Sequence, residues 1–256
     1  MFLVTDTNSA IKAYDVTTFR PTRHWLLSGM DDPWDIRSCT RNKCLYVFNW
    51  KPTAFKEIWR ICPESMKVVK KWSTGNDAGR LSVTHDSNVL LAVHSHNKIN
   101  EYTANGQLIR DIKLNAIPGV RHPWHAIKLT NGHYLFSHGD LDDSMHGVCV
   151  VNGKGEVVRS LCEKKGSTLR NLDVPVNLLI DRRGHIMVAD HNNGRVLLLS
   201  PNLEPLKAII SRSQGLRKPV RLALDEVNGF LYVVDCEFDF ATRKWQEGEV
   251  LIMRIK

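Results

Sequence analysis

Several features common in enzymes and membrane proteins are missing from this sequence. It contains no G-x-S-x-G, H-E-x-x-H or P-loop motif, and none of its six cysteines forms a C-x-x-C pair. Those motifs carry a nucleophilic serine, a catalytic zinc, a bound phosphate and a structural zinc, respectively. No apolar run approaches the roughly 18 residues that cross a bilayer as a helix. These absences disfavour the four kinds of site and a membrane-spanning helix.

The amino-terminal segment also lacks the pattern of a secretory signal. MFLVTDTNSA has no basic stretch followed by a long apolar core. We therefore expect a cytoplasmic location, with cysteines that are reduced and mostly buried. The cysteines are Cys39, Cys44, Cys62, Cys149, Cys162 and Cys236.

The composition is that of an ordinary globular protein with a moderate excess of positive charge. Of the 256 residues, 43% are hydrophobic and 24% are charged, and the net charge is +8. Such a composition excludes extended disorder. A basic surface attracts polyanions such as RNA, but a charge of this size does not separate an RNA binder from a merely basic domain.

Two series of short motifs recur along the chain. The first has a polar residue in third place: PWDI at 33–36, AGRL at 78–81, PWHA at 123–126, PVNL at 175–178 and PVRL at 219–222. The second is a β-branched and aromatic run that ends in Asp, Asn or His, at Asp6, Asn49, His94, His138, Asp190 and Asp235. Repeats every 40–50 residues with several short strands each are typical of a β-propeller.

The fifth repeat shows the expected strands most clearly. Residues 177–181, 185–189, 196–200 and 205–210 each favour a strand, and turns with Gly, Asn or Pro separate them. We predict an all-β fold, a six-bladed β-propeller of four-stranded antiparallel blades in a single domain, 1–256. The expected blades are approximately 1–28, 30–73, 77–115, 118–162, 171–211 and 216–256.

One segment resembles a known repeat. VADHNNGRVLLLSPN, at 188–202, is similar to the NHL repeat, whose pattern is roughly V-A-D-x-x-N-x-R-[IV], and FLVTDTNSAIKAYD and LAVHSHNKINEYTANGQLI are weaker copies. The arrangement resembles the C-terminal propeller of TRIM-NHL (tripartite motif) proteins. That resemblance implies RING, B-box and coiled-coil segments upstream in a full-length product. None occurs in this sequence, so ubiquitin ligase activity is not carried over.

The predicted strands do not complete six blades. The first blade lacks its inner strand and the last lacks its fourth, which leaves 22 strands where six full blades need 24. Unpaired sheet edges are a liability. This favours a fragment of a longer protein over a chain whose ends pair with each other.

Inner strands start, and second strands end, on one face of such a fold. We predict a ligand-binding face there, where arginine can grip phosphate or stack on bases and loop aromatics can anchor a partner. The candidate residues are Arg80, Arg121, His125, Asn177, Arg217, Lys218, Arg221, Trp50, Phe55 and Phe238. The alternatives are solvated charge for the basic residues and packing for the aromatic ones. For Asp6, Asn49, Asp190 and Asp235 we expect a capping role, in which the side chain accepts backbone N–H groups.

The partner predicted for this face is a protein or single-stranded RNA. Basic residues such as Lys164, Lys165 and Arg170 suit RNA, whereas the acidic insertion at 140–143 suits a protein of mixed charge. We expect a non-catalytic binding platform with no cofactor and no metal. The alternative is a metal-dependent propeller hydrolase or lyase, for which His94, His96 and His138 are the conceivable zinc ligands.

Overall fold

The fold was analysed in a computed structural model. The structure describes residues 2–6, 10–15, 18, 20–50, 55–239, 244–245 and 248–255. Nearly all of its regular structure is β-strand, and no helix in the described part of the chain is long and apolar enough to cross a membrane. The chain divides into two compact units, Met1–Asp111 and Ile112–Lys256, which we call unit 1 and unit 2.

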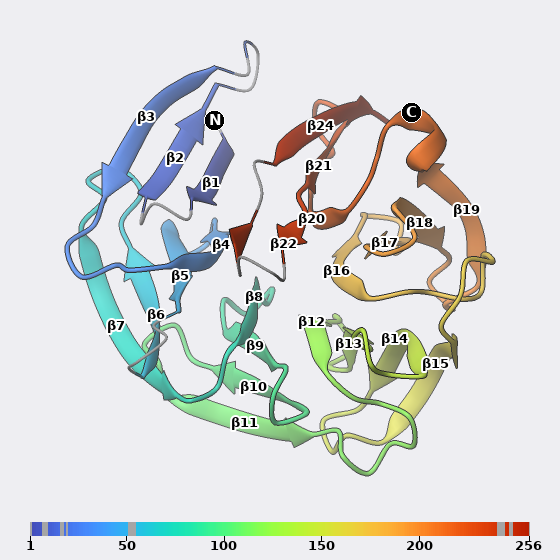
Figure 1. Ribbon diagram of the computed structural model, residues 1–256. Helices are drawn as coiled ribbons and strands as arrows, with labels where there is room; N and C mark the ends of the chain where they lie inside the picture. The colour runs from blue at the N-terminus through green and yellow to red at the C-terminus, as the bar shows by residue number, and fades with distance from the viewer. Residues whose placement is uncertain are drawn as a thin grey trace. The chain divides into compact units, whose positions relative to one another are not determined.

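Unit 1 contains three antiparallel sheets (Figure 1). The first has three strands: β1 (Phe2–Asp6), β2 (Ala10–Tyr14) and β3 (Pro21–Leu26). The second has four: β4 (Pro33–Cys39), β5 (Cys44–Asn49), β6 (Lys56–Ile61) and β7 (Val68–Gly75). The third also has four: β8 (Gly79–Val83), β9 (Val89–Val93), β10 (Lys98–Tyr102) and β11 (Leu108–Lys113), the last of which crosses the boundary between the units.

Unit 2 contains two four-stranded sheets, one three-stranded sheet and a short hairpin. The first four-stranded sheet consists of β12 (Pro123–Lys128), β13 (Tyr134–His138), β14 (Met145–Val151) and β15 (Val157–Lys164). The second consists of β16 (Pro175–Ile180), β17 (Ile186–Asp190), β18 (Arg195–Leu199) and β19 (Pro205–Ile210). A 3-10 helix, η1 (Arg212–Gln214), leads to the last sheet, β20 (Pro219–Asp225), β21 (Phe230–Asp235) and β24 (Glu249–Arg254). The hairpin pairs β22 (Phe238–Asp239) with β23 (Lys244–Trp245).

The predicted all-β propeller class is confirmed, and the blade number is a correction. Four sheets are complete four-stranded blades, and the end sheets have three strands each. The structure has five blades and not the six that we predicted. The repeats in the sequence overstate the number because a repeat marks two strands of a sheet without ensuring that all four are present.

The strands predicted for the fifth repeat match β16–β19. The fourth, at 205–210, has the predicted bounds. The first and third lie one or two residues nearer the amino terminus than predicted, and the second lies one residue nearer the carboxyl terminus. Strand β16 starts two residues earlier than expected because Pro175 already pairs with Asp190. Strand ends are harder to place than strands because alternating apolar residues do not mark the last paired position.

A proline and a β-bulge begin most inner strands. Pro33, Pro123, Pro175 and Pro219 each pair with the residue that ends the neighbouring second strand, and the pairing then skips one residue. The skipped residues are Trp34, Trp124, Val176 and Val220. Proline has no N–H to donate, so it is tolerated at the first position of a strand, where the sheet does not need that donor. The bulge after it turns the next side chain to a new direction. The recurring motif Pro-x-polar is therefore the sequence of a bulged strand start.

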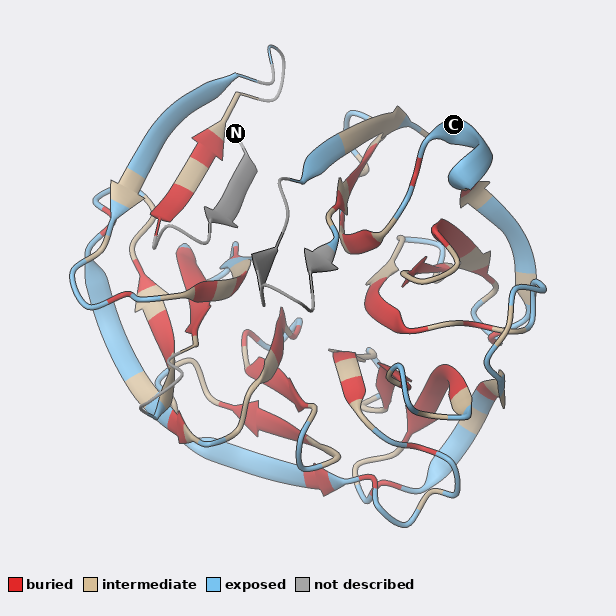
Figure 2. Cartoon of the chain, in the orientation of Figure 1, coloured by how far each residue is buried: buried red, intermediate tan, exposed pale blue. Residues whose placement is uncertain are grey.

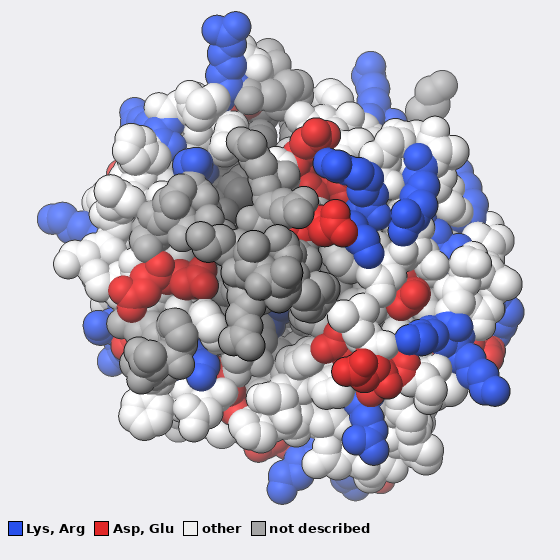
Figure 3. Space-filling model, viewed as in Figure 1, with Lys and Arg blue, Asp and Glu red and all other residues white. Residues whose placement is uncertain are grey.

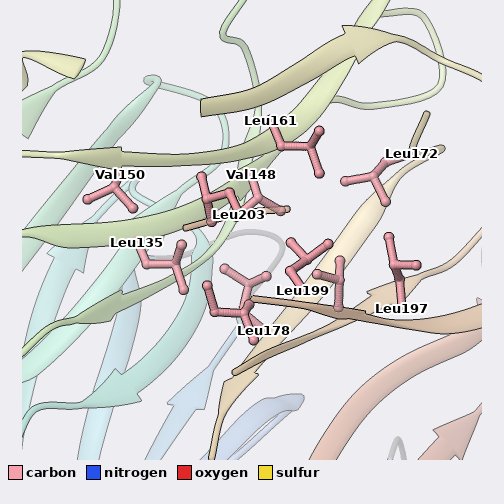
Figure 4. Close-up of a cluster of buried hydrophobic side chains, with 11 residues drawn as sticks. Leu135, Val148, Val150, Leu161, Leu172, Leu178, Leu197, Leu199 and Leu203 are labelled. Atoms are coloured by element: carbon pink, nitrogen blue, oxygen red, sulfur yellow. The ribbon is translucent and has the colours of Figure 1, made fainter. Parts of the chain in front are cut away.

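The hydrophobic core lies between sheets. In unit 2 one cluster joins the sheet β12–β15 to the sheet β16–β19, and Figure 4 shows its side chains pointing toward one another. The members include Leu135, Val148, Leu161, Leu178 and Leu197, all at most 2% exposed. Burying each such side chain contributes about 1.5–3 kcal/mol. Figure 2 shows the consequence across each sheet: the middle strands are buried, and the outer strands β7, β11, β15 and β19 are largely exposed.

Candidate functional site

The polar third residues of the inner strands join one sheet to the next. Asp35 Oδ2 accepts the backbone N–H of Leu81 at 2.8 Å, His125 Nδ1 accepts that of Leu178 at 3.3 Å, and Asn177 Oδ1 accepts that of Leu222 at 3.0 Å. All three side chains are at most 3% exposed. A buried N–H without a partner is costly, so these bonds stabilise the contact between sheets.

This placement differs from the predicted ligand-binding face. His125 and Asn177 are buried, and their polar groups serve the fold. Arg80 is also buried, at 3% exposed. Arg221 is half-buried and donates from Nη1 to the carbonyl of its neighbour Val220 at 2.9 Å. Of the predicted basic residues, the exposed ones are Arg121 and Arg217, with Lys218 half-buried.

The predicted aromatic residues are spread over both units. In unit 1, Trp50 is half-buried against Trp34, with ring centroids 6.2 Å apart, and Phe55 is 66% exposed. In unit 2, Phe238 lies in β22, but its side chain is outside the described residues. The structure thus shows packing for Trp50 and an exposed aromatic ring for Phe55.

The predicted capping role of the strand-ending residues is confirmed at three positions. Asn49 Oδ1 accepts the N–H groups of Asp31 and Asp32, at 3.0 and 3.1 Å. Asp190 Oδ1 accepts that of Asp173 at 2.8 Å. The carboxylate of Asp235 accepts those of Arg217 and Lys218. Each cap fixes the loop before the inner strand of its own sheet, and the side chain of Asp6 lies outside the described residues.

Arg195 organises the loop before β16. Its Nε donates to Asp190 Oδ2 at 2.6 Å, and its Nη atoms donate to the carbonyls of Ser167, Thr168 and Asn171 at 2.7–2.9 Å. Arg195 is 8% exposed and Asp190 is fully buried. Burial raises the pKa of Asp190, while the Arg195 guanidinium and hydrogen bonds act in the opposite direction.

His146, in strand β14 of the neighbouring sheet, also holds a loop through hydrogen bonds. Its Nε2 lies 2.9 Å from the carbonyl oxygen of Asp140 and 3.1 Å from that of Asp143, and its Nδ1 accepts the N–H of Val174 at 2.9 Å. These contacts fit a neutral imidazole protonated on Nε2. Gly139, with φ of 105°, makes room, because a Cβ there would lie 2.5 Å from the His146 ring. One buried imidazole therefore holds the loop 139–144 to the start of β16.

The same loop is held from a second side by His122. Its Nδ1 lies 2.7 Å from Asp143 Oδ2, and the backbone N–H of Asp140 donates to the same oxygen at 2.8 Å. Burial alone would raise the pKa of Asp143, but the bonds from His122 and Asp140 outweigh it and lower the pKa. The carboxylate is therefore charged at neutral pH.

Further hydrogen bonds join these loops to their neighbours. Lys165 Nζ donates to the carbonyl of Leu141, and Asn193 Nδ2 donates to that of Gly166. Arg212 Nη2 donates to the carbonyl of Asn192 at 2.6 Å, and Lys218 Nζ donates to Asn192 Oδ1 at 2.8 Å. We call this connected surface of unit 2 the loop face; it consists of residues 139–144, 164–174, 191–194 and 211–218.

Glycine is needed at the centre of the loop face. Gly194 has φ of 60°, and a Cβ there would lie 2.7 Å from both the Arg212 side chain and the backbone oxygen of Arg217. Only glycine lets the two chain segments approach so closely without strain. Position 194 belongs to the segment that most resembles the NHL pattern.

The tips of the loop face carry both charge and apolar surface. Arg217 is 65% exposed, and its ion pairs with Asp235 and Glu249 are long, at 3.8 and 4.0 Å. Leu141 and Leu169 are 40% and 45% exposed. Figure 3 shows basic and acidic side chains interleaved over the part of unit 2 where Figure 1 places β16–β21. The loop face therefore offers apolar contacts within a surface of mixed charge.

Sequence reasoning named Lys165, Arg217 and Lys218 of the loop face. It missed Asn193, Arg195 and His146, which also hold its loops together. Arg195 and Asn193 are fixed positions of the NHL pattern, so the pattern itself was the available signal. No sequence signal marked His146, because its partners are backbone atoms of residues 140, 143 and 174.

The structure gives no support to a zinc cluster within the residues that it describes, since no three His, Cys, Asp or Glu side chains there are placed to hold a metal ion. His138 is fully buried, and burial, with a further contribution from His146, lowers its pKa to about 4. All six cysteines are free; Cys39, Cys44 and Cys149 are buried and the other three are half-buried.

Comparisons with known proteins show the fold of this chain. No family model and no curated protein matches. Among solved structures, a chain of the nidogen/laminin complex is 15% identical with a TM-score of 0.67, covering 96% of this chain and 92% of that one. A functionally unknown protein from Desulfotomaculum acetoxidans is 12% identical with a TM-score of 0.62, covering 99% and 86%. Virginiamycin B lyase from Staphylococcus aureus is 14% identical with a TM-score of 0.60, covering 88% and 70%. At these identities the likenesses show a β-propeller fold, and nothing in them favours TRIM-NHL proteins specifically.

Proposed function

We propose that the protein is a non-catalytic binding platform that docks a protein partner on the loop face of unit 2. The observation that carries the proposal is that the four loops are fastened to one another before any partner binds, through Arg195, His146, Lys165 and Arg212. Loops ordered in advance cost less conformational entropy on binding, which raises affinity.

The charge of the loop face favours a protein over RNA. Arg170, Arg212 and Arg217 are exposed, but Asp140 and Asp142 in the loop 139–144 add negative charge beside them. Negative groups repel phosphate, whereas a protein can match both signs and also cover Leu141 and Leu169. The exposed arginines favour acidic residues in the docking segment.

The fold comparisons are compatible with this proposal. One similar chain comes from a complex of two proteins, nidogen and laminin. Another is a lyase, which keeps a metal-dependent enzyme as the alternative from the sequence. The resemblance to TRIM-NHL propellers and the cytoplasmic location remain predictions.

Selection from a random displayed-peptide library, beside selection from a single-stranded RNA pool, tests the proposal. We expect peptides that contain Asp or Glu and an apolar residue, and binding at least about tenfold weaker when Arg212 and Arg217 are both replaced by Glu. The matched control is Lys207→Glu, an exposed position on the outer strand β19. Selection of RNA alone, or equal weakening by the control, would refute a protein platform at this face, and stoichiometric zinc or calcium in the purified protein would favour the enzyme.

A further inference from the structure

The last sheet of unit 2 has one strand edge that no described strand covers. Its strand order is β20-β21-β24, and β24 pairs only with β21, with Val234 opposite Val250 and Tyr232 opposite Ile252. In each of the four complete sheets the corresponding third strand pairs with a fourth strand on its far side. The backbone groups on the far edge of β24 are thus available to another strand.

Side chains of β24 are more exposed than those at equivalent positions in sheets that have a fourth strand. Val250 is 36% exposed, whereas the residues at the same register position in complete sheets, Ile58, Val148 and Val196, are fully buried. Figure 2 shows β24 in the colours of exposed and intermediate residues and β18 mainly in that of buried ones. An added strand would remove apolar surface of Val250 from water.

The pairing of β18 with its fourth strand, β19, shows how a strand would pair with the far edge of β24. Strand β19 runs antiparallel to β18, with Ile210 opposite Val196 and Lys207 opposite Leu198. The equivalent partner of β24 places an aliphatic residue opposite Val250 and continues for about four residues toward Arg254. Glu249 and Arg254, exposed at the two ends of β24, favour a basic residue at the end of that partner and an acidic one at its start.

We propose that the far edge of β24 takes up one extended antiparallel strand from a partner polypeptide, with aliphatic residues at alternate positions. The mode is strand addition, in which backbone hydrogen bonds give affinity and alternate side chains give specificity. This site is separate from the proposed function, although Glu249 at its start lies 4.0 Å from Arg217 of the loop face. A partner docked on the loop face can therefore extend directly along β24.

A peptide that copies residues 201–212, the chain's own β19 with its flanks, tests this inference. We expect saturable binding by fluorescence anisotropy, with exchange of the amides at 250–254 slowed at least about tenfold. A copy methylated on the backbone nitrogens of its pairing edge should not bind. Val250→Lys should weaken binding at least about tenfold because a charged side chain blocks strand addition at an edge.

The matched control is Val227→Lys, in the turn between β20 and β21, where the valine is 81% exposed. It should leave binding unchanged. Equal binding of the methylated peptide, or equal loss in both lysine variants, would overturn the inference. So would amides at 250–254 that are already as protected without peptide as those at 195–199, since a segment of this chain or a second copy would then cover the edge. Peptides selected on the loop face should bind the Val250→Lys variant normally, so that the two proposals fail independently.

Discussion

Two neighbouring sheets of unit 2 hold their loops by different chemistry. In the sheet β16–β19, Asp190 lies opposite Arg195 and forms an ion pair with it, and the pair fastens the loop before β16 through four hydrogen bonds. In the sheet β12–β15 the same two positions are His138 and Gly147, and neither ring nitrogen of His138 makes a hydrogen bond with any described residue. There His146 and His122 fasten the loop 139–144 instead. The same arrangement of strands is therefore compatible with loops held by an Arg–Asp ion pair or by two histidines. Only the Arg–Asp pair occupies fixed positions of the NHL pattern.

The largest expected effect comes from removing the charge of Arg195. Arg195→Met keeps most of the side-chain length but leaves Asp190 buried without its cation and removes one donor from each of three carbonyls. We expect the free energy of unfolding to fall by about 3–5 kcal/mol. Urea unfolding measures it. Arg182→Met is the control, since Arg182 is 74% exposed and its ion pair with Glu226 should be worth about 1 kcal/mol or less; equal losses would contradict the role given to Arg195.

Acid should destabilise both sheets through buried neutral histidines. His138, near His146 and Asp143, and His191, near Lys218, Asp235 and Asp173, each have a pKa lowered to about 4, chiefly by burial. Because each folded-state pKa lies below the ordinary 6.5, the unfolded chain takes up protons first as pH falls from about 6.5 to 4. The free energy of unfolding should fall by about 2–4 kcal/mol between pH 7 and pH 5.

Urea unfolding across this pH range measures the effect. A double variant, His138→Leu and His191→Leu, is the comparison: its stability should depend less on pH in the same window. A wild-type stability that is flat between pH 7 and pH 5 would contradict the assignment of these side chains as buried and neutral.

Removing His146 should affect the sheet β12–β15 locally. His146→Ala leaves the carbonyls of Asp140 and Asp143 and the N–H of Val174 without their shared partner. We expect a loss of about 2–3 kcal/mol, since each buried polar group left unpaired costs roughly 1–3 kcal/mol and water can replace part of it. Hydrogen exchange should quicken at 140–144 and 174 but not at 195–199. Quickening at both would mean that the two sheets do not hold their loops independently.

The smallest effect should come from making the two sheets alike. His138→Asn puts a capping amide at the position that Asn49, Asp190 and Asp235 occupy in other sheets. Each of those caps accepts the backbone N–H of the residue seventeen positions earlier, and that residue is Arg121 for position 138. If the amide accepts the N–H of Arg121, stability should rise by about 1 kcal/mol. Thermal unfolding measures this gain, and a loss of stability would show that the His138 ring is needed for packing.

The sequence was sufficient for the parts of the fold that repeat. Alternating β-branched residues and turn residues located β16–β19, and the strand-ending Asn49, Asp190 and Asp235 were correctly predicted as caps. The blade number was wrong because a motif can recur in a sheet that lacks a strand.

The candidate site was harder to predict because burial and backbone partners leave little trace in a sequence. His125 and Asn177 have the residue types of ligand-binding side chains, yet each is used to accept an N–H from the next sheet. The hydrogen bonds of the His146 ring go to backbone atoms from segments up to 28 residues away, so its role follows from the fold and not from a motif.

Hydrogen exchange in the protein without any partner tests the central claim most directly. The claim is that Arg195, His146 and their partners order the loop face before binding. Backbone amides bonded within it, at Gly166, Asn171, Asp173 and Val174, should exchange nearly as slowly as those of β17. Exchange of these amides at the rate of an unstructured chain would contradict the claim and remove the basis for a preformed platform.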